Sequence, residues 1–205
     1  MAAILSATPT SIFTNCGLPG VAQIPYGSHM CHFYRDRSDL VAALVPFFVA
    51  GLNNNECCIW ITAEPLNAAD ARLELQKAGV DVDAAIRSGA LTIRDYSEWY
   101  TAAEGLKSNQ VAKLWLAEED SALEQGYSGL RITGNASFLT PETWPDFMDY
   151  EEVVHRAFQG RRIVSLCSYD ARRCGAADTL QVARRHSCAL NQPDEGWQVV
   201  TVTGG

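Results

Sequence analysis

The chain has 205 residues and a net charge of −8, and hydrophobic residues make up 47% of it, which is enough to bury a core without metals or disulfides. The acidic balance, with no basic run longer than two residues, argues against direct binding to nucleic acid, which needs a basic footprint. No apolar run approaches the roughly 20 residues of a membrane span, and seven cysteines, an odd number, favour reduced thiols in a cytoplasmic protein over a disulfide framework.

The amino-terminal part of the chain is predicted to form a flexible arm over residues 1–22, with any order in it near 13–21, before one domain over 23–205. A turn at 24–27 leads into the first predicted strand, Met30–Tyr34. Because side chains alternate along a strand, two sets are expected on opposite faces: His29, Cys31 and Phe33 on one, and Met30, His32 and Tyr34 on the other.

Strands and helices alternate along the rest of the chain. Strands are predicted over 57–62, 91–94, 129–133 and 163–167, and helices over 38–50, 68–78, 83–88, 109–125, 145–158 and 176–186. Pro46 is expected to kink the first helix or to mark a shorter first turn, and 95–100 is predicted to be an aromatic and acidic loop. Segments 187–191 and 197–200 are predicted to form a hairpin. The pattern predicts an α/β fold with three layers, a mostly parallel central sheet and a C-terminal antiparallel hairpin.

Polar, aromatic and thiol side chains collect where the predicted strands end. In α/β proteins ligands bind at the carboxyl edge of the sheet, and small-molecule pockets combine apolar walls with a few orienting polar groups. The side chains expected at this edge are His29, Cys31, His32, Tyr34, Glu64, Tyr96, Glu98, Trp99, Tyr100, Arg131, Thr133, Asn135, Cys167, Tyr169 and Asp170.

The chemistry of this edge is left open by the residues alone. The segment Arg35–Asp39, where a glycine-rich phosphate loop would follow the first strand, has no glycine and no Gly-Lys-Ser/Thr, which argues against ATP chemistry. Cys31 or Cys167 could act as a nucleophile with a histidine base, or as a small core residue, the commoner fate of a buried thiol. A metal site is the further alternative, with ligands drawn from His29, Cys31, His32, Cys167 and Cys174, or from His186, although no complete zinc knuckle is present.

Several sequence blocks together resemble one family, the MEDS domain (methanogen/methylotroph DcmR sensory domain). The similarity covers about residues 20–200, and its blocks follow in order: Ile24–Tyr34, Leu44–Phe48, Ala50–Leu52, Cys58–Pro65, Tyr96–Tyr100, Gly126–Asn135, Asp149–Glu151, Leu166–Tyr169 and Cys174–Ala176. A more distant resemblance, carried by Gly51–Glu64, is to the RecA/KaiC-like ATPase core without its phosphate loop.

The resemblance implies a stand-alone sensor for a small organic molecule of the hydrocarbon-derivative class. The output would pass to a separate protein, such as a histidine kinase or a regulator of transcription or of a sigma factor, and a homo-oligomer is possible. No enzymatic activity and no cofactor are expected. The ligand-binding residues that it implies are His29, Cys31, Phe33, Tyr34, Trp60, Glu64, Trp99, Tyr100, Arg131, Cys167 and Tyr169.

Overall fold

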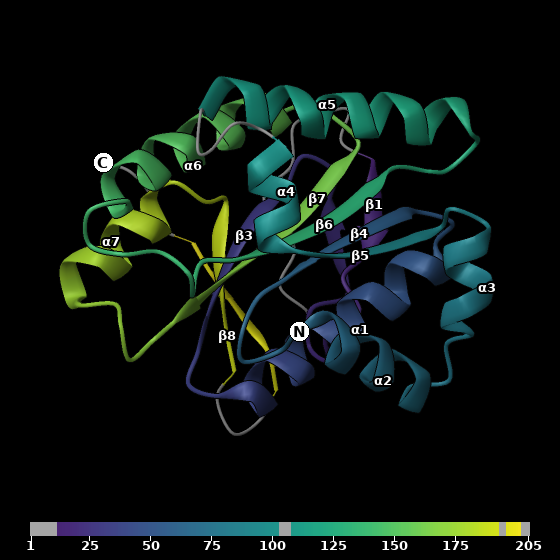
Figure 1. Ribbon diagram of the computed structural model, residues 1–205, viewed down its shortest axis with the longest axis horizontal. Coiled ribbons are helices and arrows are strands. Elements are labelled where there is room, and N and C mark those ends of the chain that lie inside the picture. Colours follow the sequence, from purple (N-terminus) through teal and green to yellow (C-terminus); the bar gives the residue numbers. More distant parts are fainter. Residues whose placement is uncertain (1–11, 103–107, 193–195, 202–205) are drawn as a thin grey trace.

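A seven-stranded sheet forms the centre of the computed structural model, which describes residues 12–102, 108–192 and 196–201 (Figure 1). The strand order is β5-β4-β6-β7-β3-β8-β9, and only the terminal pair β8–β9 is antiparallel. The predicted α/β class, mostly parallel sheet and C-terminal hairpin are confirmed. The strands are β3 (His29–Tyr34), β4 (Cys57–Thr62), β5 (Leu91–Asp95), β6 (Leu130–Asn135), β7 (Ile163–Asp170), β8 (Cys188–Asn191) and β9 (Gln198–Val200).

Helices cover both faces of this sheet and make three layers (Figure 1). On one face lie α1 (Arg37–Asn53), α2 (Ala68–Lys77) and α3 (Val82–Arg87); on the other lie α4 (Tyr96–Ala102), α5 (Ser108–Glu124), α6 (Trp144–Phe158) and α7 (Ala176–Arg184). Each face carries its own apolar core, which explains why the inner strands are nearly continuous apolar runs. None of the helices in the described ranges is long and apolar enough to cross a bilayer.

The alternation predicted for β3 is confirmed. Met30 and Tyr34 are buried in the core beneath α1, whereas Cys31 and Phe33 pack in the core beneath α6. The register with parallel strand β7 sets Cys31 opposite Cys167 and Phe33 opposite Tyr169. Residues from these two neighbouring strands therefore share the face that α6 covers.

One predicted break in regular structure is wrong, and a second stays a prediction. Helix α1 includes Pro46, where the burial of Phe47 and Phe48 offsets the backbone hydrogen bond that proline cannot make, and the expected kink stays a prediction. The predicted loop after β5 is instead helix α4, and the carboxylate of Asp95 accepts a hydrogen bond from the backbone N–H of Ser97 in its first turn.

The segment before β3 is packed rather than loose from residue 12 onward. Strand β1 (Phe13–Asn15) pairs with β2 (Gln23–Pro25), and Cys16, Leu18 and Val21 are buried. This order falls on the stretch 13–21, where the sequence analysis allowed it within the predicted arm; residues 1–11 lie outside the described ranges.

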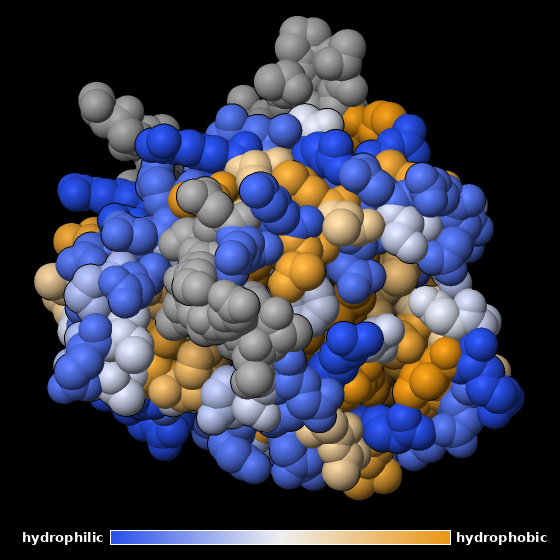
Figure 2. Space-filling model, turned by 45° about the horizontal axis from the view of Figure 1, so that its top comes forward, coloured by the Kyte–Doolittle hydropathy of each residue, from blue (hydrophilic) through white to orange (hydrophobic). Residues whose placement is uncertain are grey.

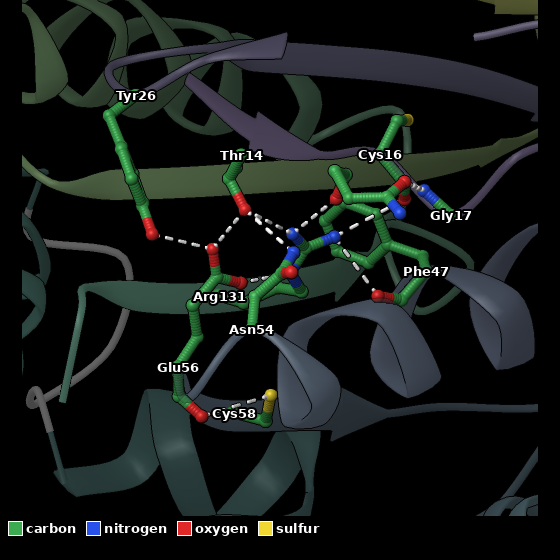
Figure 3. Close-up of polar contacts among 10 residues, drawn as sticks. Thr14, Cys16, Gly17, Tyr26, Phe47, Asn54, Glu56, Cys58 and Arg131 are labelled. Carbon is green, nitrogen blue, oxygen red and sulfur yellow. Dashed lines mark hydrogen bonds and ion pairs between the residues drawn. The ribbon is translucent and has the colours of Figure 1, made fainter. Parts of the chain in front are cut away.

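A buried ion pair holds this segment against the sheet (Figure 3). Arg131 Nε donates to Glu56 Oε2 at 2.5 Å, and the guanidinium also donates to the carbonyl oxygens of Asn15 and Phe47 at 2.7 and 3.0 Å. Glu56 accepts from the hydroxyls of Thr14 and Tyr26 at 2.6 and 2.7 Å. Segments far apart in the sequence are thus joined by one charged pair.

The surface seen in Figure 2 mixes hydrophilic and hydrophobic residues. The hydrophobic residues show in separate groups between hydrophilic ones rather than as one continuous patch. Such a mixture is ordinary for the surface of a globular protein.

Candidate functional site

A buried polar cluster lies between the sheet and helices α6 and α7. We use this name for the side chains of His29, Glu151, Cys167, Tyr169 and His186, all of which are buried or nearly so. His29 opens β3, Cys167 and Tyr169 are on β7, Glu151 is on α6, and His186 follows α7. Polar side chains are uncommon in such a core unless they are paired or bind a ligand.

Glu151 is at the centre of the cluster. Its Oε1 accepts a hydrogen bond from the Tyr169 hydroxyl at 2.8 Å. Its Oε2 lies 3.0 Å from Nε2 of His29 and 3.5 Å from Nε2 of His186, without a hydrogen bond of acceptable geometry to either. The sulfur of Cys167 lies 3.4 Å from Nε2 of His29. Four potential ligand atoms therefore face a common point.

The backbone around α7 fixes how the two imidazoles carry their protons. Nδ1 of His186 lies 2.8 Å from the carbonyl oxygen of Val182, and Nδ1 of His29 lies 3.2 Å from that of Arg185. A carbonyl oxygen only accepts, so each Nδ1 must carry the hydrogen. In the neutral rings both Nε2 atoms are then lone-pair sites directed into the cluster. The rings are stacked with centroids 3.9 Å apart, which places these lone pairs side by side.

Burial favours the uncharged forms of the whole cluster. It lowers the pKa of His29 and of His186 to about 3 and raises the pKa of Glu151. It also raises the pKa values of Cys167 and Tyr169 well above their usual ranges. The contact between His29 and Glu151 is therefore not a simple ion pair, because desolvation disfavours both charges.

A small cavity of about 20 Å³ adjoins the cluster. Apart from cluster residues, apolar side chains such as Trp115, Ile132 and Phe147 form much of its wall. This volume holds about one water molecule or one ion, since a single water needs roughly 10–15 Å³ on this measure. An organic molecule does not fit.

A larger outer pocket of about 280 Å³ lies where β6 and β7 end. Tyr169 and Ala136 border both this pocket and the small cavity. Tyr169 is thus shared by the two cavities, and its hydroxyl bonds to the buried Glu151. The outer pocket is lined by Ala136, Ser137, Leu139, Thr140, Pro141, Trp144, Tyr169, Asp170, Arg173, Cys174 and Asp178.

Comparison with protein-family models gives one match, to "MEDS: MEthanogen/methylotroph, DcmR Sensory domain", over residues 28–187. The chain belongs to the MEDS family. The matched span includes every residue of the buried polar cluster, from His29 to His186. No curated protein matches the chain in sequence.

Solved structures share the fold of this MEDS domain. A KaiC-like protein from Pyrococcus horikoshii OT3 superposes with a TM-score of 0.58 at 12% identity, covering 92% of this chain and 85% of that one. An uncharacterized protein from the same species, crystallised with an unknown peptide, gives 0.60 at 16% identity, covering 86% and 84%. The flagellar accessory protein FlaH from Methanocaldococcus jannaschii gives 0.55 at 11% identity, covering 87% and 80%. At these identities the likeness shows the fold alone, and it agrees with the distant KaiC-like resemblance.

The amino end of α1 departs from a phosphate-binding arrangement. Only Arg35 and Asp36 lie between β3 and α1, where the sequence showed no glycine-rich loop. The Asp36 carboxylate accepts hydrogen bonds from the backbone N–H groups of Ser38 and Asp39 at 2.9 and 3.1 Å. A bound phosphate would use such helix N–H groups, and here a protein carboxylate already occupies them.

The structure brings together some of the sequence-predicted ligand residues. His29, Cys167 and Tyr169 meet in the buried polar cluster. Cys31 and Phe33 lie beside this cluster on the same face of the sheet. Of the alternative metal set, His29 and Cys167 are in contact. His32 instead packs against Trp197 on the opposite face, Cys174 lines the outer pocket, and the Cys31 thiol donates to the Cys188 carbonyl oxygen. The predicted set of five metal ligands is therefore wrong as a set.

Other predicted residues have different surroundings. Trp60 stacks on Phe48 in the core beneath α1, and Trp99 stacks on Trp115 at a centroid distance of 4.1 Å. Tyr34 donates to Asn135 on the α1 face, and Glu64 is exposed. The Tyr100 side chain lies outside the described part of the chain. Arg131 sits near the amino end of β6 in its ion pair with Glu56, so its placement at a carboxyl strand end is wrong.

Sequence reasoning missed Glu151 as a site residue. The signal was present in α6, whose buried side chains include Phe147, Tyr150, Val154 and Phe158. Glu151 falls inside this apolar stripe at helical spacing. An acidic residue there needs a partner or a ligand, and this could have marked it as a candidate.

Proposed function

We propose that this MEDS domain is the input module of a signalling system and binds a small organic molecule in the outer pocket. The observation that carries the proposal is the position of Tyr169, which is among the residues that line that pocket and whose hydroxyl bonds to buried Glu151. A molecule in the pocket would lie against a residue whose side chain reaches into the core. The family description supports a sensory role.

The charged groups around the outer pocket already have protein partners. Arg173 donates to the carbonyl oxygens of Ser137 and Leu139, and Asp170 pairs with Arg172. Asp178 accepts from the backbone N–H of Gly175 at 2.9 Å. Much of what the pocket offers a ligand is therefore apolar surface, from residues such as Leu139, Pro141 and Trp144. Such a lining favours an uncharged hydrocarbon derivative.

Signalling requires that the ligand favour one conformation or one assembly over another, because equal affinity for both shifts nothing. We propose that the output passes to a separate cytoplasmic regulator or kinase and that the domain does not hydrolyse nucleotides. The Asp36 carboxylate at the amino end of α1 supports the second point, since it takes the N–H groups that a phosphate would use.

A thermal-melt screen tests the proposed ligand class. The panel holds small halogenated and oxygenated hydrocarbons, with Mg-ATP as the contrasting ligand. A ligand at about 100 times its Kd stabilises by about 2.7 kcal/mol, which raises Tm by roughly 5–10 °C in a domain of this size. We expect a shift with an uncharged organic compound and none with Mg-ATP.

Two substitutions at one position locate the binding site. Cys174 is a partly exposed residue that lines the outer pocket. Cys174→Leu adds volume to the pocket and should abolish the shift, whereas Cys174→Ser keeps the volume and should retain it. An equal response of both variants would place the ligand elsewhere, and a shift with Mg-ATP alone would overturn the proposed ligand class.

A further inference from the structure

We propose that His29, Glu151, Cys167 and His186 form a buried site for one divalent transition-metal ion of the zinc type. This site is distinct from the outer pocket and does not depend on the function proposed for that pocket. The four ligand atoms, one from each residue, all lie within 4.8 Å of one another. Imidazole, thiolate and carboxylate are the ligand types that zinc takes in proteins.

Three of the six separations between the ligand atoms are close to those of a tetrahedron around one ion. Zinc bonds of about 2.0–2.1 Å to nitrogen, 2.0–2.2 Å to oxygen and 2.3 Å to sulfur imply separations of about 3.3 Å for a nitrogen–oxygen pair and about 3.6 Å for a nitrogen–sulfur pair. The observed values are 3.0 and 3.5 Å from Glu151 Oε2 to the two imidazoles and 3.4 Å from His29 to the Cys167 sulfur. The other three pairs lie within 4.8 Å, so the side chains must draw closer together to enclose an ion.

Unpartnered atoms are a second observation that favours a ligand here. Among the residues that the structure describes, Glu151 Oε2 and His186 Nε2 have no hydrogen-bond partner, and the exposure of the two side chains is 1% and 0%. A buried polar atom without a partner is unfavourable, because it has lost its hydrogen bonds to water. A proton between Glu151 and His29 would satisfy one imidazole and leave the other lone pair unpaired. One cation satisfies all of them.

The outer hydrogen bonds are those of a prepared metal site. Both imidazoles donate from Nδ1 to backbone carbonyl oxygens, Val182 for His186 and Arg185 for His29, which leaves Nε2 free to bind. Tyr169 donates to the second oxygen of Glu151 and so orients the carboxylate.

Charge and volume agree with a closed, single-ion site. A divalent cation with a thiolate and a carboxylate is neutral overall, which removes the main cost of burying charge. Binding releases the protons of Cys167 and Glu151 to solvent. The adjoining cavity of about 20 Å³, which is lined by His29, Glu151 and Cys167 but not by His186, has room for one ion and not for an organic molecule. Four protein ligands with no open position favour a structural or sensing ion over a catalytic one.

Metal analysis of the purified full chain is the first test. We expect about one equivalent of zinc after expression in zinc-containing medium, a fall in Tm when a strong chelator removes it, and recovery on adding Zn²⁺ alone. Cobalt added to the chelated protein should give a thiolate-to-cobalt charge-transfer band. A wild-type chain that binds neither zinc nor cobalt overturns the proposal, whatever the organic-ligand screen shows.

Matched cysteine variants test the ligand set. Cys31 is opposite Cys167 on the neighbouring strand, is buried on the same face and is outside the proposed set. Cys167→Ser should lose the cobalt charge-transfer band and most of the bound zinc, whereas Cys31→Ser should keep both. Equal binding by the two variants, or loss in Cys31→Ser alone, overturns the assignment. Circular dichroism of each metal-free variant checks that it is folded.

Tyr169→Phe separates an orienting role from general packing. The substitution removes the hydroxyl that bonds to Glu151 and leaves the ring in place. Loss of such an outer hydrogen bond typically weakens metal affinity about 10–100-fold. Competition with a chelator of known affinity measures this change, and an unchanged zinc Kd would refute the role of Tyr169.

Discussion

Replacing Glu56 by Gln should cause one of the largest losses of stability that a single polar substitution can produce in this domain. The Arg131 guanidinium has 0% exposure, and Glu56 is its only carboxylate partner among the described residues. Gln keeps an oxygen for the hydroxyls of Thr14 and Tyr26 but removes the negative charge. The buried guanidinium is then uncompensated, which costs about 3–5 kcal/mol.

A loss of this size is a large fraction of the roughly 5–15 kcal/mol that stabilises most domains. It corresponds to a fall in Tm of roughly 6–20 °C at this chain length. Glu152→Gln is the matched control, because Glu152 pairs with Arg156 at 2.7 Å on the surface, with 39% and 75% of the two side chains exposed. An exposed helix pair contributes only about 0.3–0.5 kcal/mol.

Urea denaturation followed by tryptophan fluorescence and by circular dichroism measures both losses. The double variant Glu56→Gln with Arg131→Met should recover part of the stability, since it removes the unpaired charge together with its partner. Equal free energies of unfolding for Glu56→Gln and Glu152→Gln would refute the reasoning. It would also be refuted if the double variant lost more free energy of unfolding than its two single variants lose together.

Two further predictions concern the same half of the molecule. Gly51→Ala should lower the free energy of unfolding by about 1–2 kcal/mol, although alanine has the better helix propensity. The new Cβ would lie 2.5 Å from Cδ of Arg131 and 2.8 Å from Sγ of Cys58, which is too close. An unchanged free energy of unfolding in urea would show that Arg131 can move aside. Burial lowers the pKa of His32 to about 4, against an opposing effect of Asp39. The unfolded chain therefore binds more protons than the native one between about pH 6.5 and 4, so His32 lowers stability as pH falls through that window. Between pH 6.5 and pH 5 the free energy of unfolding should fall by about 2 kcal/mol because of His32. The variant His32→Phe should not show this part of the fall. If the free energies of unfolding of the two proteins change with pH in parallel, the prediction is contradicted.

Local signals made much of the fold predictable. Alternation placed His29, Cys31 and Phe33 on one face of the first central strand, and that arrangement is observed. Asn67 caps α2 by accepting from the backbone N–H of Asp70, as its position before an apolar-periodic segment predicts. Such signals act within a few residues, which is the range that a single sequence reports well.

Partnerships across long separations were not predictable from the single sequence. Arg131 had no visible carboxylate partner, because Glu56 is 75 residues away and joins it only through the folded sheet. Trp60 and Trp99 suggested ligand walls, yet stacking on Phe48 and on Trp115 gives each a packing role. Large aromatic side chains fill cores as readily as pockets, and their position in three dimensions decides between the two.

Tyr169 links the two proposed sites, and the link has a thermodynamic consequence. The residue lines the outer pocket, and its hydroxyl bonds to the carboxylate of the proposed metal site. If an organic ligand favours a state in which this hydroxyl leaves Glu151, then the ligand must weaken metal binding. Metal must weaken ligand binding by the same factor, because coupling between sites is reciprocal. Couplings of this kind are typically about 5–150-fold, so a ligand that leaves zinc affinity unchanged cannot be signalling through Tyr169.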